Sequence, residues 1–157
     1  EATMVQLSRR NLLTLAAAFA VAPPALADTL PKIHVAKDAG CGCCNAWIGH
    51  VRDAGFPVSF EEMERGTLEN LKQSLGLTPE QFSCHTALVD DYVIEGHVPA
   101  ADIRRLLDTR PDVIGLTVPG MPYGSPGMGP ETEREAYDVL AVARDGSASV
   151  FTSYPAA

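Results

Sequence analysis

Apolar residues follow two different spacings along the chain, and each spacing predicts one kind of element. A short apolar run at 32–37 predicts a strand. The next segment repeats apolar residues at the three-and-four spacing of one helix face: Cys44, Trp47, Ile48 and Val51. Glycine and proline at 55–57 predict the end of this helix, and residues 58–60 a second strand.

Further along, the pattern predicts a second helix from Thr67, closed by Gly76, and a short helical turn at 78–81. Two strand-like runs follow at 86–89 and 92–95. Asp90-Asp91 separates them, so a two-residue turn would place Val89 opposite Tyr92. These residues therefore predict a hairpin after the second helix.

A third helix begins after Pro99 and must end before Pro111. Residues 119–130 are too rich in proline and glycine for a helix and predict a shaped loop before a last hairpin at 137–143 and 147–152. This order predicts an α/β fold. We expect a thioredoxin-like sheet with flanking helices, a Pro/Gly/Met loop and a C-terminal hairpin extension.

The charge argues against two classes of binding partner, and the N-terminal sequence predicts where the protein is located. The net charge of −8 argues against nucleic acid and against an anionic membrane surface. Arg9-Arg10, the apolar run 12–22 and the small residues Ala25 and Ala27 predict an export signal over 1–27, cleaved after Ala27. The paired arginines favour the twin-arginine route, and a generic secretory signal is the alternative.

We therefore expect a periplasmic protein with no membrane insertion after cleavage. It would have a metal-binding domain over 28–118 and an extension over 119–157 packed on the same domain.

Three of the four cysteines crowd into Cys41-Gly42-Cys43-Cys44, at the predicted start of the first helix. Unpaired N–H groups and the positive end of the helix dipole favour a thiolate there. Cys41 and Cys44 alone would form a Cys-x-x-Cys redox pair, with Cys41 as nucleophile. Cys43 is surplus for disulfide exchange and adds a soft ligand, which favours Cu(I).

In an exported protein, four cysteines would by default form two disulfides. Sulfurs as crowded as those of Cys41, Cys43 and Cys44 predict poor disulfide geometry, however. We therefore favour a functional thiol cluster over a purely structural framework.

The predicted sheet brings a fourth thiol to this cluster. The first strand runs toward the end of the sheet where the hairpin begins, so Cys84 should lie beside the cysteine loop. Counting back from the turn places Cys84 opposite His97. His85 adjoins Cys84, although alternation along a strand could turn it to the other face.

Two histidines and two methionines remain as candidate ligands, and distance from the thiols excludes the histidines. His34 lies inside the first strand, and His50 about two helical turns beyond Cys43, so neither is expected to be a ligand. Met121 and Met128 lie on the Pro/Gly loop, where a thioether is a soft ligand or a packing group. Both roles remain open for Met121, and packing is favoured for Met128.

Four stretches in order resemble one family: 37–44 with Trp47 and His50, 83–87, 92–99 and 120–128. They are similar to the periplasmic CopG-type copper-resistance proteins, the metal-binding "domain of unknown function 411". Ala39 stands where many members have proline, and Asp91 where many have glycine. The resemblance implies a thioredoxin-like fold, a multinuclear copper site bridged by cysteines, and a role in copper detoxification by interconverting Cu(I) and Cu(II).

Carried onto this chain, the resemblance places the family's cysteine motifs at Cys41, Cys43 and Cys44, and at Cys84 with His85. We expect copper to be held by these four thiolates, with three candidates for completing the site: His85, His97 and Met121. A copper efflux system or another periplasmic copper protein is the expected partner. Two alternatives remain open: a metal-free thiol-disulfide oxidoreductase using Cys41 and Cys44, and a structural zinc module.

Overall fold

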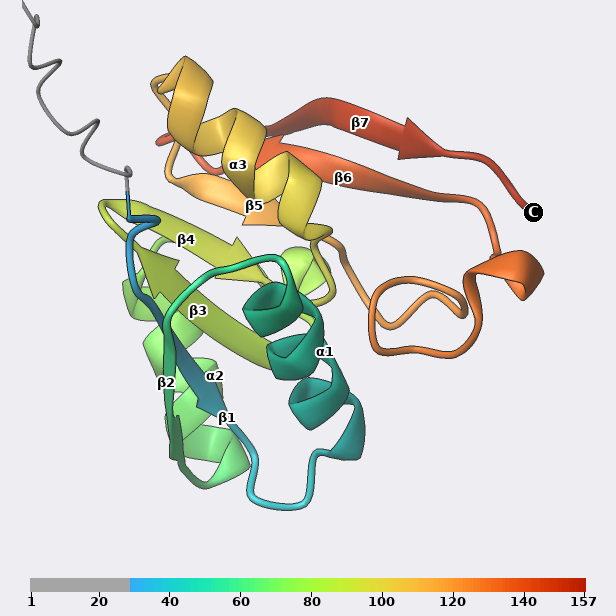
Figure 1. The fold of residues 1–157 in the computed structure, drawn as a ribbon. Coiled ribbons are helices and arrows are strands. Elements are labelled where there is room, and N and C mark those ends of the chain that lie inside the picture. Colours follow the sequence, from blue (N-terminus) through green and yellow to red (C-terminus); the bar gives the residue numbers. More distant parts are fainter. Residues whose placement is uncertain (1–28) are drawn as a thin grey trace, which may run out of the picture.

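The computed structural model describes residues 29–157, so the predicted export signal lies outside the described residues (Figure 1). The elements follow in this order: β1 (Ile33–Lys37), α1 (Gly42–Asp53), β2 (Val58–Glu62), α2 (Arg65–Ser74), η2 (Pro79–Gln81), β3 (His85–Val89), β4 (Tyr92–Glu95), α3 (Ala100–Thr109), β5 (Gly115–Thr117), η3 (Glu131–Glu133), β6 (Tyr137–Val142) and β7 (Ala148–Tyr154). Within these residues, no helix is both long and apolar enough to span a bilayer.

All the strands join one mixed sheet in the order β2-β1-β3-β4-β5-β6-β7. The pairs β1–β2 and β4–β5 are parallel, and each is connected through a helix, α1 or α3. The other neighbours are antiparallel. In Figure 1, α1 and α3 lie on one face of the sheet and α2 on the other. The mixed α/β class predicted from the sequence is therefore confirmed.

The main core lies between the sheet and the helices α1 and α3. Trp47 is fully buried on α1, and its indole N–H donates to the Val98 carbonyl at 2.9 Å. Ile103 and Leu106 of α3 fill the same cluster. Burying side chains of this size contributes about 1.5–3 kcal/mol each, so the fold has a source of stability that does not depend on a ligand.

The hairpin between β3 and β4 has the predicted register, with Val89 opposite Tyr92. Asp90 takes a left-handed backbone with φ of 49°, which aspartate tolerates better than most residues, and Arg110 bonds its carboxylate at 2.6 Å. This register matters because it determines which residues lie opposite each other at the far end of the hairpin.

The start of the second helix differs from the sequence prediction. Helix α2 begins at Arg65 rather than Thr67, because its exposed first turn carries no apolar residue that would announce it. The C-terminal hairpin β6–β7 continues the sheet through β6, which pairs antiparallel with the three-residue strand β5. The domain boundaries at 27 and 118 stay predictions.

Candidate metal centre

The cysteine loop lies where β1 ends and α1 begins. Cys41 is the N-cap residue of α1, and its sulfur accepts the N–H of Cys44 at 3.3 Å. Cys43 and Cys44 therefore occupy the first turn, as predicted. This position places sulfur beside the unpaired N–H groups at the positive end of the helix, which favours an anionic ligand atom.

The fourth cysteine reaches this loop through strand pairing. Because β1 and β3 are antiparallel with Lys37 opposite His85, the residue just before β3 lies next to the loop that follows β1. The Cys84 sulfur lies 3.7 Å from that of Cys43 and 3.5 Å from that of Cys44. The predicted convergence of Cys84 on the thiol cluster is therefore present in the structure.

Two imidazoles complete the cluster. His97 Nε2 lies 3.0 Å from the Cys84 sulfur, and its Nδ1 lies 2.8 Å from the Pro126 carbonyl oxygen. Only a protonated Nδ1 can donate to that carbonyl, so the neutral ring keeps a free lone pair on Nε2, facing the sulfur. His85 Nδ1 lies 3.3 Å from the same sulfur, so His85 turns toward the site rather than away.

Burial sets the protonation of these groups. It lowers the pKa of His97, and it lowers the pKa of His85 well below its ordinary value, so both rings are neutral near pH 7. Neutral imidazole is the form that ligates metal. Burial, with help from nearby Cys43, raises the pKa of the Cys84 thiol to about 12. A metal bound at Cys84 must therefore displace a proton.

Cys41 and Cys44 are joined by a disulfide, whereas Cys43 and Cys84 are free thiols. The Cα atoms of the bonded pair are 5.3 Å apart, inside the ordinary range for disulfides. The expectation that crowding would give poor disulfide geometry was therefore wrong for this pair, because two intervening residues at a helix start bring the Cα atoms to a suitable separation.

The potential ligands fall into two groups that share Cys84. One holds the four cysteine sulfurs, and the other holds Cys84 with His85 and His97; within each group the ligand atoms lie within 4.8 Å of one another. Soft thiolates select Cu(I), and imidazole also suits Cu(II) and zinc. With the disulfide formed, only Cys43, Cys84 and the two imidazoles can act as ligands of this kind.

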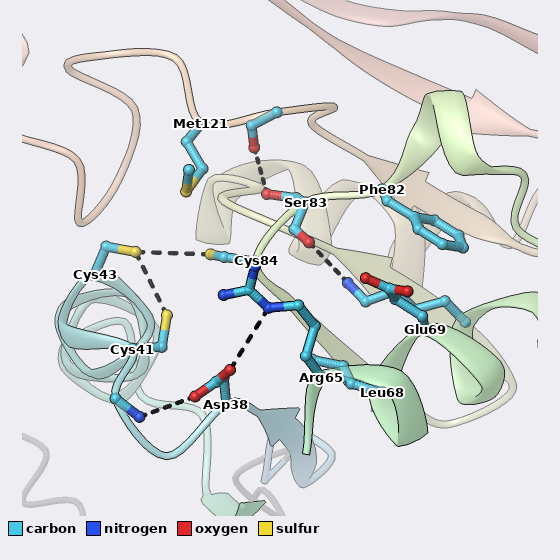
Figure 2. A pocket seen from close by; sticks show the side chains of 13 residues that line it. Asp38, Cys41, Cys43, Arg65, Leu68, Glu69, Phe82, Ser83, Cys84 and Met121 are labelled. Atoms are coloured by element: carbon cyan, nitrogen blue, oxygen red, sulfur yellow. Dashed lines mark hydrogen bonds and ion pairs between the residues drawn. The ribbon is translucent and has the colours of Figure 1, made fainter. Parts of the chain in front are cut away.

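A pocket of about 590 Å³ opens onto this cluster (Figure 2). Cys41, Cys43 and Cys84 form one side, and α2 contributes the opposite wall with Arg65 and Leu68. Cys44 and the two imidazoles do not line it. A ligand in this pocket would therefore meet the sulfurs of Cys41, Cys43 and Cys84 and not that of Cys44.

The two methionine candidates, Met121 and Met128, lie in different environments. Met121 lines the pocket, is 53% exposed, and in Figure 2 its side chain points toward Cys43 and Cys84. Met128 is half-buried and does not line the pocket. Gly127, next to it, packs on α1: a Cβ there would lie 2.9 Å from the Cys43 carbonyl oxygen, and its φ is +87°. The loop carrying both methionines is thus held tightly against the cysteine helix.

The other two histidines serve elsewhere. His34 is exposed on β1 and contacts Ser59 at 2.9 Å and Glu61 at 3.1 Å. His50 Nε2 accepts the N–H of Ala100 at 3.1 Å and so caps the start of α3. Neither belongs to the ligand groups, as the sequence predicted.

Sequence reasoning missed a buried ion pair beneath Cys84. Lys72 of α2 contacts Glu95 at the end of β4, and both side chains are almost fully buried. Burial raises the pKa of the Glu95 carboxyl, and the Lys72 ammonium opposes this rise. A carboxylate ending the apolar run Tyr-Val-Ile was the one available sign in the sequence.

The fold and the site together define a mixed α/β protein with a cysteine- and histidine-lined centre compatible with metal binding. No curated protein matches the chain. The family model described as "Protein of unknown function, DUF411" matches residues 81–128.

Two solved structures, "Copper resistance protein copG- Form 1" and "Form 2", are each 44% identical with a TM-score of 0.74. The matches cover 80% of this chain and 98% and 99% of theirs. The chain belongs to the CopG-type copper-resistance family.

Proposed function

We propose that the protein binds copper in the periplasm and contributes to copper resistance. The observation that carries the proposal is the convergence of three cysteine sulfurs and two imidazoles on the sulfur of Cys84. A set so rich in sulfur favours Cu(I), and its two imidazoles suit Cu(II) as well. Family membership supports copper over other soft metals, since both matched structures are of copper resistance proteins.

The proposed ligands are Cys41, Cys43, Cys44 and Cys84, completed by His85 and His97. Met121 is a further candidate from the pocket wall. Several sulfurs within bridging distance support a multinuclear site, and the mixture of sulfur and nitrogen supports interconversion of Cu(I) and Cu(II). The thioredoxin-like assignment, the twin-arginine export signal and transfer of copper to an efflux system belong to the same proposal.

The second candidate is a thiol-disulfide oxidoreductase, and the Cys41–Cys44 disulfide favours it. Cys41 lines the pocket and Cys44 is buried behind it, which is the arrangement of an attacking and a resolving thiol. In that function Cys43 is a bystander. In the copper function Cys43 is one of the few sulfurs able to bridge neighbouring ions.

Cys43→Ser therefore separates the two candidates. For copper binding we expect a lower copper stoichiometry and lower copper tolerance with an unchanged fold, because a hard serine oxygen cannot replace a thiolate toward Cu(I). Metal analysis of fully reduced, reconstituted protein measures the first effect, and growth on copper the second.

Cys44→Ser serves as the matched variant. We would abandon the copper assignment if Cys43→Ser bound as much Cu(I), as tightly, as the parent while Cys44→Ser alone abolished reduction of a model disulfide.

A further inference from the structure

The buried ion pair between Lys72 and Glu95 is an unusual feature for a domain of this size. Lys72 is 1% exposed and Glu95 is 0% exposed, and the two come from α2 and β4 on either side of the residues that lead into Cys84. Removing two charges from water carries a large desolvation cost, and such pairs seldom add net stability over apolar replacements. Stability alone is therefore a weak reason for this pair.

The partners of the pair indicate what it holds. The Ser83 N–H donates to Glu95 Oε1 at 2.6 Å, and Lys72 Nζ donates to the Ser83 carbonyl oxygen at 2.9 Å, a bond drawn in Figure 2. The same Glu95 oxygen receives the ammonium of Lys72, and its second oxygen accepts the hydroxyl of Thr86. Both backbone polar groups of Ser83 are thus bonded to one ion pair.

Ser83 also connects Cys84 to the loop that carries Met121. The Ser83 hydroxyl donates to the Gly120 carbonyl, and the Gly120 N–H donates to the Phe82 carbonyl at 3.0 Å. Residues 82–84 precede β3 and have no strand partner of their own. The Phe82 backbone is bonded by other backbone groups, whereas the N–H and carbonyl of Ser83 are bonded by the side chains of Glu95 and Lys72. A shift of Ser83 would move Cys84 directly and the Met121 loop through Gly120.

We propose that Lys72 and Glu95 are positioning residues, which hold the Ser83 backbone so that the Cys84 sulfur meets the other ligands of the centre. This inference rests on the proposed copper function only for its second measurement below. The first measurement follows the Cys84 thiol and needs no bound copper.

The main test variant is Lys72→Met/Glu95→Leu, which keeps side chains of similar size and removes both bonds from the ion pair to the Ser83 backbone. Lys72→Met/Glu95→Gln is the graded variant, because a glutamine oxygen can still accept the Ser83 N–H. The first measurement uses a Cys43→Ser background with the Cys41–Cys44 disulfide intact. Cys84 is then the one free thiol, and its reaction rate with an aromatic disulfide reports how it is held.

We expect the rate to rise at least threefold in the leucine variant and less in the glutamine variant. In proteins with Cys43 present and fully reduced, competition with a chromophoric Cu(I) chelator should show at least a tenfold loss of affinity in the same order. Replacing a residue that orients a metal ligand lowers metal affinity by about 10- to 100-fold in other metal sites.

Asp102→Asn is the matched control. Asp102 is also a buried carboxylate, which accepts the Tyr154 hydroxyl at 2.7 Å, but its partners lie on β7 and, in the case of Arg105, on α3. This variant should lower the thermal unfolding midpoint and leave both Cys84 reactivity and Cu(I) affinity unchanged. The control thereby separates positioning from general destabilisation.

Unchanged Cys84 reactivity in the folded leucine variant would overturn the proposal. If both double variants fail to fold, amide hydrogen exchange of the parent protein provides the test. The Ser83 amide should then be as protected as the amides of β3 and β4. Exchange of the Ser83 amide at the rate of an exposed loop would overturn the positioning role of Lys72 and Glu95. A parent that binds no copper, with Cys84 reactivity changed as expected, would refute the copper function and leave the positioning role standing.

Discussion

Cys84 belongs to both groups of potential ligands, so replacing it by serine should damage the centre more than any other single change in residues 29–157. The substitution removes a sulfur that lies 3.5 Å from Cys44 and 3.0 Å from His97 Nε2. Serine has nearly the same shape. Because Cys84 is half-buried and lies outside the apolar core, the cost in unfolding free energy should be about 1 kcal/mol or less.

The effect on copper should be much larger than the effect on stability. Losing a residue that merely orients a metal ligand costs about 10- to 100-fold in affinity. Losing the shared ligand itself should then cost at least about 100-fold, which corresponds to roughly 2.8 kcal/mol of binding free energy. Oxygen from serine would not compensate, since a hydroxyl is a hard and weakly acidic ligand.

Competition of the reduced protein with a chromophoric Cu(I) chelator measures this loss. His34→Ala and His50→Ala are the controls, because His34 contacts Ser59 and Glu61 and His50 caps α3. Each should change affinity by less than about twofold, given that neither touches the ligands. Equal losses in all three variants would refute the assignment of Cys84 as the shared ligand.

Two further predictions concern the protein without metal. Removing copper should leave a folded chain, because the core around Trp47 and Ile103 needs no ion. Its thermal unfolding, followed by near-UV circular dichroism, should be cooperative. Absence of a tertiary signal would instead favour the zinc module, in which the energy of metal binding drives folding. Stability should also fall as the pH drops below about 6.5, because burial lowers the pKa of His50, His85 and His97 and the unfolded chain takes up their protons first. His50→Gln, whose amide can still accept the Ala100 N–H, should reduce that slope by up to about 1.4 kcal/mol per pH unit in chemical denaturation, and an unchanged slope would contradict the assignment.

Much of the fold could be predicted because its signals are local. Glycine and proline after α1, the capping box at Thr78 and Gln81, and the paired aspartates of the hairpin each act within a few residues. The antiparallel partnership of β5 and β6 could not be predicted in the same way. Strand periodicity says which residues face the core, but it does not say which strand lies alongside.

The same distinction between local and long-range signals applies to the candidate site. The approach of Cys84 and His97 followed from counting along a hairpin, where each residue has one partner. The orientation of His85 could not be derived, because the residue begins β3 and its ring is directed by packing on Trp47, with ring centres 4.5 Å apart. Lys72 contacts Glu95 across two elements far apart in the chain, and no spacing rule connects them.

The exceptions to ordinary burial gather around Cys84. Within residues 29–157, His85 Nε2 is the one buried side-chain nitrogen or oxygen without a hydrogen-bond partner. The ion pair of Lys72 and Glu95 and the Cys84 thiol with its raised pKa lie beside it. Each of these features costs free energy in the metal-free chain. Their concentration at one end of the sheet is what selection for a ligand, rather than for stability, would leave behind.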